Sequence, residues 1–194
     1  EPRISPQGPT TRLWPWLAIV PILPLHVLLL RSEGRLWICS CGKVLLWASN
    51  VCSAYNSQHF LDAFSFTHVL HGFLYAWLIA WLGPRLTFDW RLTLAIAVEA
   101  LWEVFENSNF IIERYRTETA ALGYHGDTII NSIGDLGCAV LGFLIAQALG
   151  FRRSAVLFLL LEVVLLVWIR DSLLLEVVML VRPVNAIKVW QMCH

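Results

Sequence analysis

The fold is decided by the stretch Phe64-Ser-Phe-Thr-His68-Val-Leu-His71-Gly-Phe-Leu-Tyr-Ala-Trp-Leu-Ile-Ala-Trp-Leu82. It contains no Lys, Arg, Asp or Glu. From residue 64 to residue 82 it is close to the about 20 residues with which a helix crosses a bilayer. The stretch therefore predicts a transmembrane helix, and its two histidines are polar groups that such a helix carries only for a reason.

Four further segments of the same kind lie on either side of it. They are Leu13–Leu30, Phe88–Phe105, Ile129–Leu149 and Ala155–Ile169. Of the 194 residues, 58% are hydrophobic and 14% are charged, and the mean hydropathy is +0.65, whereas an ordinary soluble domain has roughly 25% charged residues. We expect an all-α polytopic transmembrane helix bundle with about five spans, forming a single integral membrane domain over residues 1–194.

Three details of this arrangement are less regular. Pro15, Pro21 and Pro24 fall in the first segment, which we interpret as a retained, kinked helix rather than a signal peptide, because no small-residue cleavage site follows. After the fifth segment, residues 172–190 suggest a C-terminal re-entrant or interfacial helix. The tight connections are expected at Gly83–Phe88 and Gly150–Arg153.

The number and distribution of charged residues indicate which partners and which cellular location we expect for the protein. Fourteen Lys and Arg balance fourteen Asp and Glu, so no basic field supports nucleic-acid binding, and membrane lipids are the expected surroundings. The short N-terminal side holds its positive residues with few acids, which favours a cytoplasmic N-terminus in a bacterial inner membrane. The long loops, Arg31–Asp62 and Asn107–Thr128, would then be periplasmic. Trp14, Trp16, Trp81 and Trp90 would form an aromatic belt at the cytoplasmic interface.

Ionisable residues recur inside the apolar segments at helical spacing. His68 and His71 are three residues apart, which places them on one helical face. Two more single-faced sets follow on the third and fourth segments: Glu99, Glu103 and Glu106, and then Asp127, Asn131 and Asp135. In the five-span arrangement these sets approach one membrane surface, so we expect them to share a polar cavity that opens towards the long loops.

Two interpretations of this cavity stay open. Imidazoles and carboxylates are ligands of Zn, Mn and Fe, so a divalent metal such as Zn is one expected cofactor, although its identity is left open. The alternative is a buried hydrogen-bond network that only fixes helix packing. In the first interpretation the roles are as follows: His68, His71 and His59 bind the metal; Glu99, Glu103, Glu106, Asp127 and Asn131 are catalytic; Arg114, Arg170 and Asn107 bind substrate.

The first long loop also contains cysteines, in Cys39-Ser-Cys41-Gly and at Cys52. In an oxidising compartment Cys52 could bridge to Cys39 or Cys41. The Cys-x-Cys pair could instead hold a soft metal. A haem held by His26 and a histidine of the second segment has no specific support.

Several strings together resemble a known family. They are Cys39-Ser-Cys-Gly, Asn56-Ser-Gln-His59, Thr67-His68-Val-Leu-His71-Gly-Phe, Trp102-Glu103-Val-Phe-Glu106-Asn-Ser, Phe110-Ile-Ile-Glu113-Arg-Tyr and Gly126-Asp127-Thr-Ile-Ile-Asn131-Ser. Between about Ile38 and Gln191 the chain resembles an uncharacterised family of bacterial inner-membrane proteins of unknown function. More distantly, the Trp-Glu-x-x-Glu run followed by Asp-x-x-x-Asn is similar to VanZ-like membrane proteins. The resemblance implies a polytopic inner-membrane fold and no activity.

Three functional hypotheses follow. The first is a membrane-embedded, metal-dependent hydrolase or transferase acting on a lipid-linked substrate, with Arg114 or Arg170 attracting an anionic headgroup. The second is a non-catalytic accessory or assembly subunit of a larger membrane complex. The third is a proton-coupled transporter. The sequence shows no inverted repeats, which argues against this third hypothesis.

Overall fold

The computed structural model describes residues 13–121 and 123–192. The N-terminal tail, for which a cytoplasmic position was expected, lies mostly outside the described residues. Within the described ranges the chain is mainly helical, with two short strands. The elements are α1 (Trp14–Ser32), β1 (Trp47–Ala48), β2 (Leu61–Asp62), α2 (Ser65–Leu82), α3 (Phe88–Glu106), α4 (Asn109–Glu118), α5 (Ile129–Trp168), α6 (Leu173–Val181) and α7 (Asn185–Gln191).

The helix boundaries follow from local chemistry. Thr87, Ser108, Thr128 and Ser172 precede α3, α4, α5 and α6, and each side-chain oxygen accepts a hydrogen bond from a backbone N–H in the first turn. Such a cap satisfies one of the free N–H groups that every helix start leaves. At the other end, α2 stops before Gly83-Pro84, where proline cannot continue a helix.

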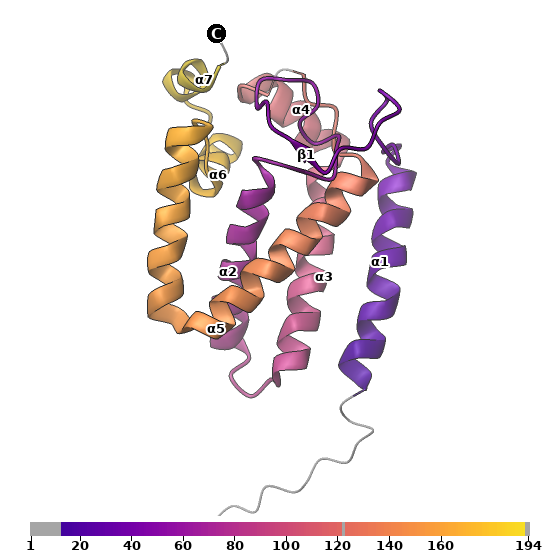
Figure 1. Ribbon diagram of the computed structural model, residues 1–194, viewed down its shortest axis with the longest axis vertical. Coiled ribbons are helices and arrows are strands. Elements are labelled where there is room, and N and C mark those ends of the chain that lie inside the picture. The colour runs from indigo at the N-terminus through magenta and orange to yellow at the C-terminus, as the bar shows by residue number, and fades with distance from the viewer. Residues whose placement is uncertain (1–12, 122, 193–194) are drawn as a thin grey trace, which may run out of the picture.

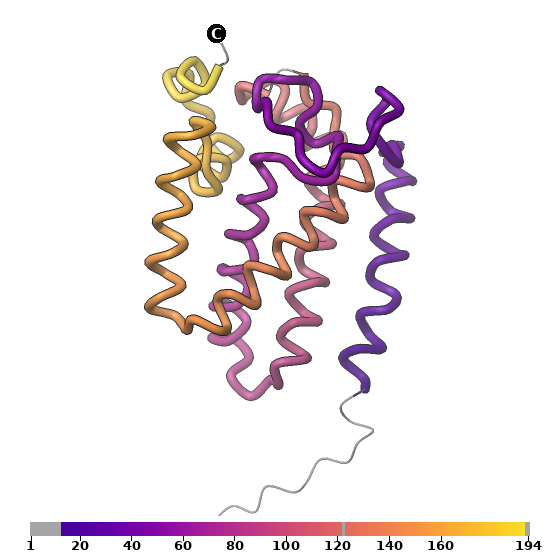
Figure 2. The backbone as a smooth tube through the Cα atoms, in the orientation of Figure 1, coloured from indigo at the N-terminus to yellow at the C-terminus, as the bar shows by residue number. Residues whose placement is uncertain are grey.

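The long helices run side by side, and the connections separate to the two ends of the bundle (Figure 1). β1, α4, α6 and α7 gather at one end, whereas the α2–α3 turn lies at the opposite end. The tube in Figure 2 shows the long loop between α1 and α2 crossing the first of these ends. Within that loop, β1 and β2 pair in parallel, with Trp47 opposite Leu61 and Ala48 opposite Asp62.

The helix α5 is bent in its middle. Over its 40 residues only Gly150 has non-helical backbone angles, with φ 71° and ψ 167°, a conformation that glycine adopts without the steric penalty of a Cβ. The two halves diverge from this residue (Figure 1). The expected spans Ile129–Leu149 and Ala155–Ile169 are therefore the two arms of one bent helix, and the connection expected at Gly150–Arg153 is reduced to the bend.

Among the residues that the structure describes, three helices are long and apolar enough to cross a membrane: α1, α2 and α5. The helix α3 has the expected boundaries but carries several charged residues, and it is not among these three. The all-helical expectation is thus consistent with the structure, whereas the count of about five spans is not confirmed.

The most extensive helix contact joins α2 to α5, and glycines permit it. A Cβ added to Gly72 would fall on the backbone of α5 around Ala139, and one added to Gly142 would fall on the backbone of Val69. Gly134 packs in the same way against the Phe60 carbonyl. These close approaches bring the polar faces of α2 and α5 within reach of one another.

Several local expectations were wrong. The expected helix over residues 172–190 is two short helices, α6 and α7, because Pro183 interrupts it. The first segment, in contrast, is helical as expected, since α1 runs from Trp14 to Ser32 with Pro21 and Pro24 inside it. The loop Asn107–Thr128 contains α4. Gly137, unlike Gly134 and Gly142 on the same helix, has open space beside it, since an added Cβ would meet nothing within 4 Å.

Candidate functional site

A buried polar cluster lies where α2, α3 and α5 meet. His68 and His71 come from α2, Glu99 and Glu103 from α3, and Asp135 from α5. All five side chains are buried, and Glu99 and Glu103 are fully so. The helical spacing that placed each set on one face thus brings the sets into direct contact.

The Glu99 carboxylate accepts hydrogen bonds from the imidazoles of both His68 and His71. Its Oε1 accepts a hydrogen bond from His68 Nδ1 at 2.7 Å, and its Oε2 accepts one from His71 Nδ1 at 3.2 Å. The Tyr75 hydroxyl donates a third bond to Oε2 at 2.7 Å. With Nδ1 of each ring committed to the carboxylate, Nε2 of each is the atom left for a ligand, which is how carboxylates orient metal-binding histidines.

Two further carboxylates, those of Glu103 and Asp135, lie close to His68. Its Nε2 lies 4.0 Å from Asp135 Oδ2, and its Nδ1 lies 3.1 Å from Glu103 Oε1. Among the described residues, neither Glu103 Oε1 nor Asp135 Oδ1 has a hydrogen-bond partner. His68, His71 and Glu99, and likewise His68, Glu103 and Asp135, offer ligand atoms within 4.8 Å of one another. Buried carboxylate oxygens without donors favour a cation or a proton between them.

A hydrogen-bonded chain leads away from Glu103. The Ser132 hydroxyl lies 2.6 Å from Glu103 Oε2 and 2.9 Å from His26 Nε2, and His26 Nδ1 donates to the Ala100 carbonyl at 3.3 Å. One hydroxyl proton cannot serve both neighbours of Ser132. A further proton on either Glu103 or His26 completes the chain, so this chain can store and move a proton.

The cluster forms the floor of a cavity of about 1080 Å³, to which it contributes His68 and Asp135. The wall combines apolar groups such as Phe64, Ile169 and Met179 with carboxylates. The acids that line it are Asp62, Glu106, Asp127, Asp135, Asp171 and Glu176. No Lys or Arg is found among the described residues of this wall. A cavity of this kind favours cationic or neutral ligands over anions.

Asp127, in the cavity wall, is hydrogen-bonded to Asn107. Asn107 Nδ2 donates to Asp127 Oδ2 at 2.7 Å, and the Asp127 backbone N–H donates back to Asn107 Oδ1 at 2.7 Å. The Tyr124 hydroxyl donates to Asp127 Oδ1 at 3.0 Å. Burial raises the pKa of Asp127, although these hydrogen bonds favour its charged form. Glu106 accepts a bond from the Tyr115 hydroxyl at 3.0 Å in the same wall.

The two arginines expected at the site form hydrogen bonds away from the cluster. The Arg114 guanidinium donates to the carbonyls of Leu180 and Val181, and Arg170 donates to the carbonyl of Trp190. Both arginines thus bond to the backbone of the C-terminal helical region. Asn131 is buried on α5, and its Nδ2 has no hydrogen-bond partner among the described residues.

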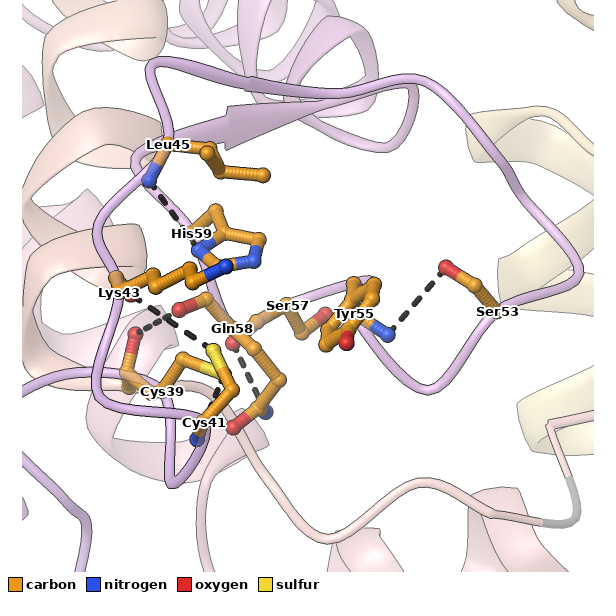
Figure 3. Close-up of a disulfide and its surroundings, with 10 residues drawn as sticks. Cys39, Cys41, Lys43, Leu45, Ser53, Tyr55, Ser57, Gln58 and His59 are labelled. Carbon is orange, nitrogen blue, oxygen red and sulfur yellow. Dashed lines mark hydrogen bonds between the residues drawn. A yellow bond between two sulfur atoms is a disulfide. The ribbon is translucent and has the colours of Figure 1, made fainter.

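His59 lies with cysteines rather than with the other histidines. Cys39 and Cys41 form a disulfide with each other, so the expected bridge from Cys52 to either of them is wrong. A ring nitrogen of His59 lies within 4.8 Å of both sulfur atoms, and Figure 3 shows the ring above the bridge. His59 Nδ1 accepts a hydrogen bond from the Leu45 N–H at 3.3 Å.

Sequence reasoning missed some members of the cluster. Asp135 had been placed on the right helical face but was left out of the expected catalytic set. Tyr75 lies four residues after His71, a spacing that puts it on the same face and that would have revealed it. Ser132 and His26 gave no comparable signal, because their contact joins α5 to α1.

Comparison with known proteins gives the family. Residues 30–193 match the family described as "Protein of unknown function (DUF2585)". A UPF0314 protein of Paracoccus denitrificans is 42% identical over 94% of each chain. A UPF0314 protein of Brucella anthropi is 42% identical over 90% of this chain and 89% of its own, and one of Agrobacterium fabrum is 44% identical over 91% and 89%.

No solved structure matches the chain significantly. These comparisons give no evidence for the more distant relationship to VanZ-like proteins. They do bear out the resemblance to an uncharacterised bacterial family. The chain belongs to the DUF2585 (UPF0314) family of bacterial proteins of unknown function.

Proposed function

We propose that the protein is a polytopic enzyme of the bacterial inner membrane that uses a divalent metal, such as Zn, for hydrolysis or group transfer on a lipid-linked substrate. The observation that supports this best is the set of His68, Glu103 and Asp135, whose ligand atoms lie within 4.8 Å of one another. All three side chains are buried, and His68 and Asp135 line a cavity that has room for a substrate. The proposal keeps about five spans, with α3 and both arms of α5 counted among them.

The surface of the bundle supports a membrane location. Large apolar side chains are exposed on α1, on α2 and along the second arm of α5, including Val20, Leu78 and Val167. Contiguous exposure of this extent is typical of a surface that another apolar phase covers. The four tryptophans expected at one interface, Trp14, Trp16, Trp81 and Trp90, are all exposed. They lie at the beginning of α1, the end of α2 and the beginning of α3, which share one end of the bundle (Figure 1).

The ligand chemistry fits a borderline divalent metal. We assign His68 Nε2, Glu103 and Asp135 as ligands, with His71 as a further donor. Glu99 is the positioning residue that orients both rings, since its oxygens are occupied by their Nδ1 atoms. When bound, such a metal lowers the pKa of a coordinated water and so supplies a nucleophile. Glu106, in the cavity wall, is the candidate general base.

The residues that line the cavity indicate which class of substrate it can bind. Its mixture of apolar and polar groups suits an amphiphilic molecule. Because acids line the described wall and Arg114 and Arg170 bond elsewhere, an anionic headgroup held by these arginines is not favoured. We propose that the part of the substrate that reaches the cluster is neutral or cationic.

Metal analysis tests this proposal without a known substrate. The protein is purified in detergent without chelators, incubated with Zn, Mn or Fe(II), desalted and measured by elemental mass spectrometry. We expect about one metal per chain, lost in His68→Ala and in Asp135→Ala. Glu113→Gln changes an exposed carboxylate and is the matched control, which should keep the metal. Wild type without stoichiometric metal under every condition would exclude the metalloenzyme.

A proton-coupled transporter is the second candidate, and one observation favours it. The Ser132 hydroxyl links Glu103 to His26 inside the helix bundle, in a chain of hydrogen bonds along which a proton could pass. In that case pH-dependent proton uptake by proteoliposomes would be lost in Ser132→Ala, and no metal would be required. The accessory-subunit hypothesis stays a prediction, for which stable copurification with a larger membrane complex is the test.

A further inference from the structure

The cysteine pair of the first long loop lies outside the cluster and has features that a structural bridge does not need. The disulfide joins Cys39 and Cys41, two positions apart, with their Cα atoms 5.1 Å apart. A bridge that closes so short a loop removes little freedom from the unfolded chain and so contributes little to stability. Stability therefore does not explain the pair.

The two sulfurs differ in their surroundings. Cys41 is exposed, whereas Cys39 is only 4% exposed, and both line the cavity. The Cys41 backbone N–H points at Cys39 Sγ at 3.2 Å. An incoming thiolate therefore reaches Cys41 first, and a negative charge on Cys39 would be stabilised by a donor that is already in place.

His59 adds a second donor beside the bridge. The ring is 1% exposed, and its Nδ1 accepts a bond from Leu45 N–H, so the proton of the neutral ring is on Nε2. That Nε2 is buried and has no hydrogen-bond partner among the described residues. Since a ring nitrogen lies within 4.8 Å of both sulfurs, His59 is placed to donate a hydrogen bond to a departing thiolate.

We propose that Cys39 and Cys41 form a redox-active disulfide that exchanges with dithiols. One thiolate of the dithiol attacks Cys41 Sγ, the disulfide bond breaks, and Cys39 Sγ leaves with the electron pair. The second thiolate of the dithiol attacks its own sulfur of the mixed disulfide, and Cys41 leaves as a thiolate. The dithiol loses two electrons and becomes a disulfide, and the cysteine pair is reduced. The departing thiolate is stabilised by a hydrogen bond from His59, and solvent supplies the protons.

A single-turnover experiment tests the exchange. The full-length oxidised protein in detergent is mixed with a reduced dithiol peptide, and the peptide disulfide is measured by mass spectrometry. We expect one equivalent per chain. The Cys39→Ser/Cys41→Ser double variant keeps the disulfide in which Cys52 takes part, so its yield is subtracted. An equal yield from wild type and double variant would overturn the proposal.

Single variants test the assigned roles. Cys39→Ser, treated with a peptide disulfide, should trap a mixed disulfide on the exposed Cys41, and Cys41→Ser should trap about tenfold less, because thiol access limits the reaction. His59→Asn keeps an acceptor for the Leu45 N–H and removes Nε2. It should slow exchange about tenfold, whereas His125→Asn, in the same cavity wall, should not.

A soft-metal site is the alternative outcome. The reduced protein is therefore also titrated with zinc. One zinc per chain that His59→Asn abolishes, together with no exchange in wild type, would overturn the redox assignment in favour of a Cys39–Cys41–His59 metal site. Exchange in wild type with unaltered zinc binding in His59→Asn would support the redox assignment.

Discussion

Replacing Gly142 with alanine should push α2 and α5 apart. The added Cβ would fall on the Val69 backbone, and backbone cannot move aside as a flexible side chain can. Val69 directly follows His68, and Gly142 lies seven residues, about two turns, after Asp135. The same displacement therefore widens the space between the two groups of the cluster that come from these helices.

The expected magnitude follows from a comparison with Gly137→Ala. Both substitutions replace a glycine of α5 by alanine, which by helix propensity alone stabilises the fold by about 1 kcal/mol. A Cβ at Gly137 meets nothing within 4 Å, so this variant should show that gain. Gly142→Ala adds an overpacking penalty of about 1–3 kcal/mol. Since about 1 kcal/mol shifts Tm by roughly 2–4 °C at this chain length, it should melt about 2–12 °C below the Gly137 variant.

The assay is thermal unfolding of both variants and wild type in one detergent, followed by tryptophan fluorescence and elution on a sizing column. Metal binding is measured on the same samples below the unfolding transition. We expect Gly142→Ala to bind the metal more weakly and Gly137→Ala to match wild type. Equal Tm values for the two variants would refute the close α2–α5 contact, and with it the geometry assigned to the cluster.

Three further perturbations test other parts of the structure. Ser132→Ala removes the partner shared by Glu103 and His26 and should lower the unfolding free energy by about 1–3 kcal/mol, measured by chemical denaturation; an unchanged value would contradict the hydrogen-bonded chain. Arg114→Ala frees the backbone of α6 and should speed proteolysis there, with the metal content unchanged. Burial raises the pKa of Asp171 from 3.8 to about 7, so the fold keeps a proton that the unfolded chain releases. Stability should fall as pH rises from about 4 to about 7, and Asp171→Asn should lack this fall in Tm measured over pH 4–8.

The long helices could be predicted from the sequence because apolar length and local stop signals determine them. Phe88–Phe105 was expected and Phe88–Glu106 is found, and α2 begins one residue later than expected. The short elements could not be predicted in this way. The helix α4 lies in a polar stretch without an apolar span, and each strand has only two residues, too few for a pattern.

The contact of His68 and His71 with Glu99 and Glu103 could be anticipated, since spacings of three and four residues fix which side chains share a face. The different roles within the cluster could not. Glu99 accepts hydrogen bonds from two imidazoles, whereas Oε1 of Glu103 has no hydrogen-bond partner among the described residues. This difference depends on the relative axial position of the helices. The placement of the arginines depends on the fold of the C-terminal segment, which hydropathy does not describe.

Because α5 bends at Gly150, a small change in the angle there would move the far end of its second arm. From Gly150 to Ile169 the chain rises about 28 Å along a helix, and Ile169 is where this arm reaches the cavity wall. A 10° change in the angle at Gly150 would therefore move that wall by about 5 Å. The width of the cavity beside His68 thus depends on the backbone angles of Gly150, which lies at the other end of the second arm of α5. A Cβ added to Gly150 would meet nothing within 4 Å.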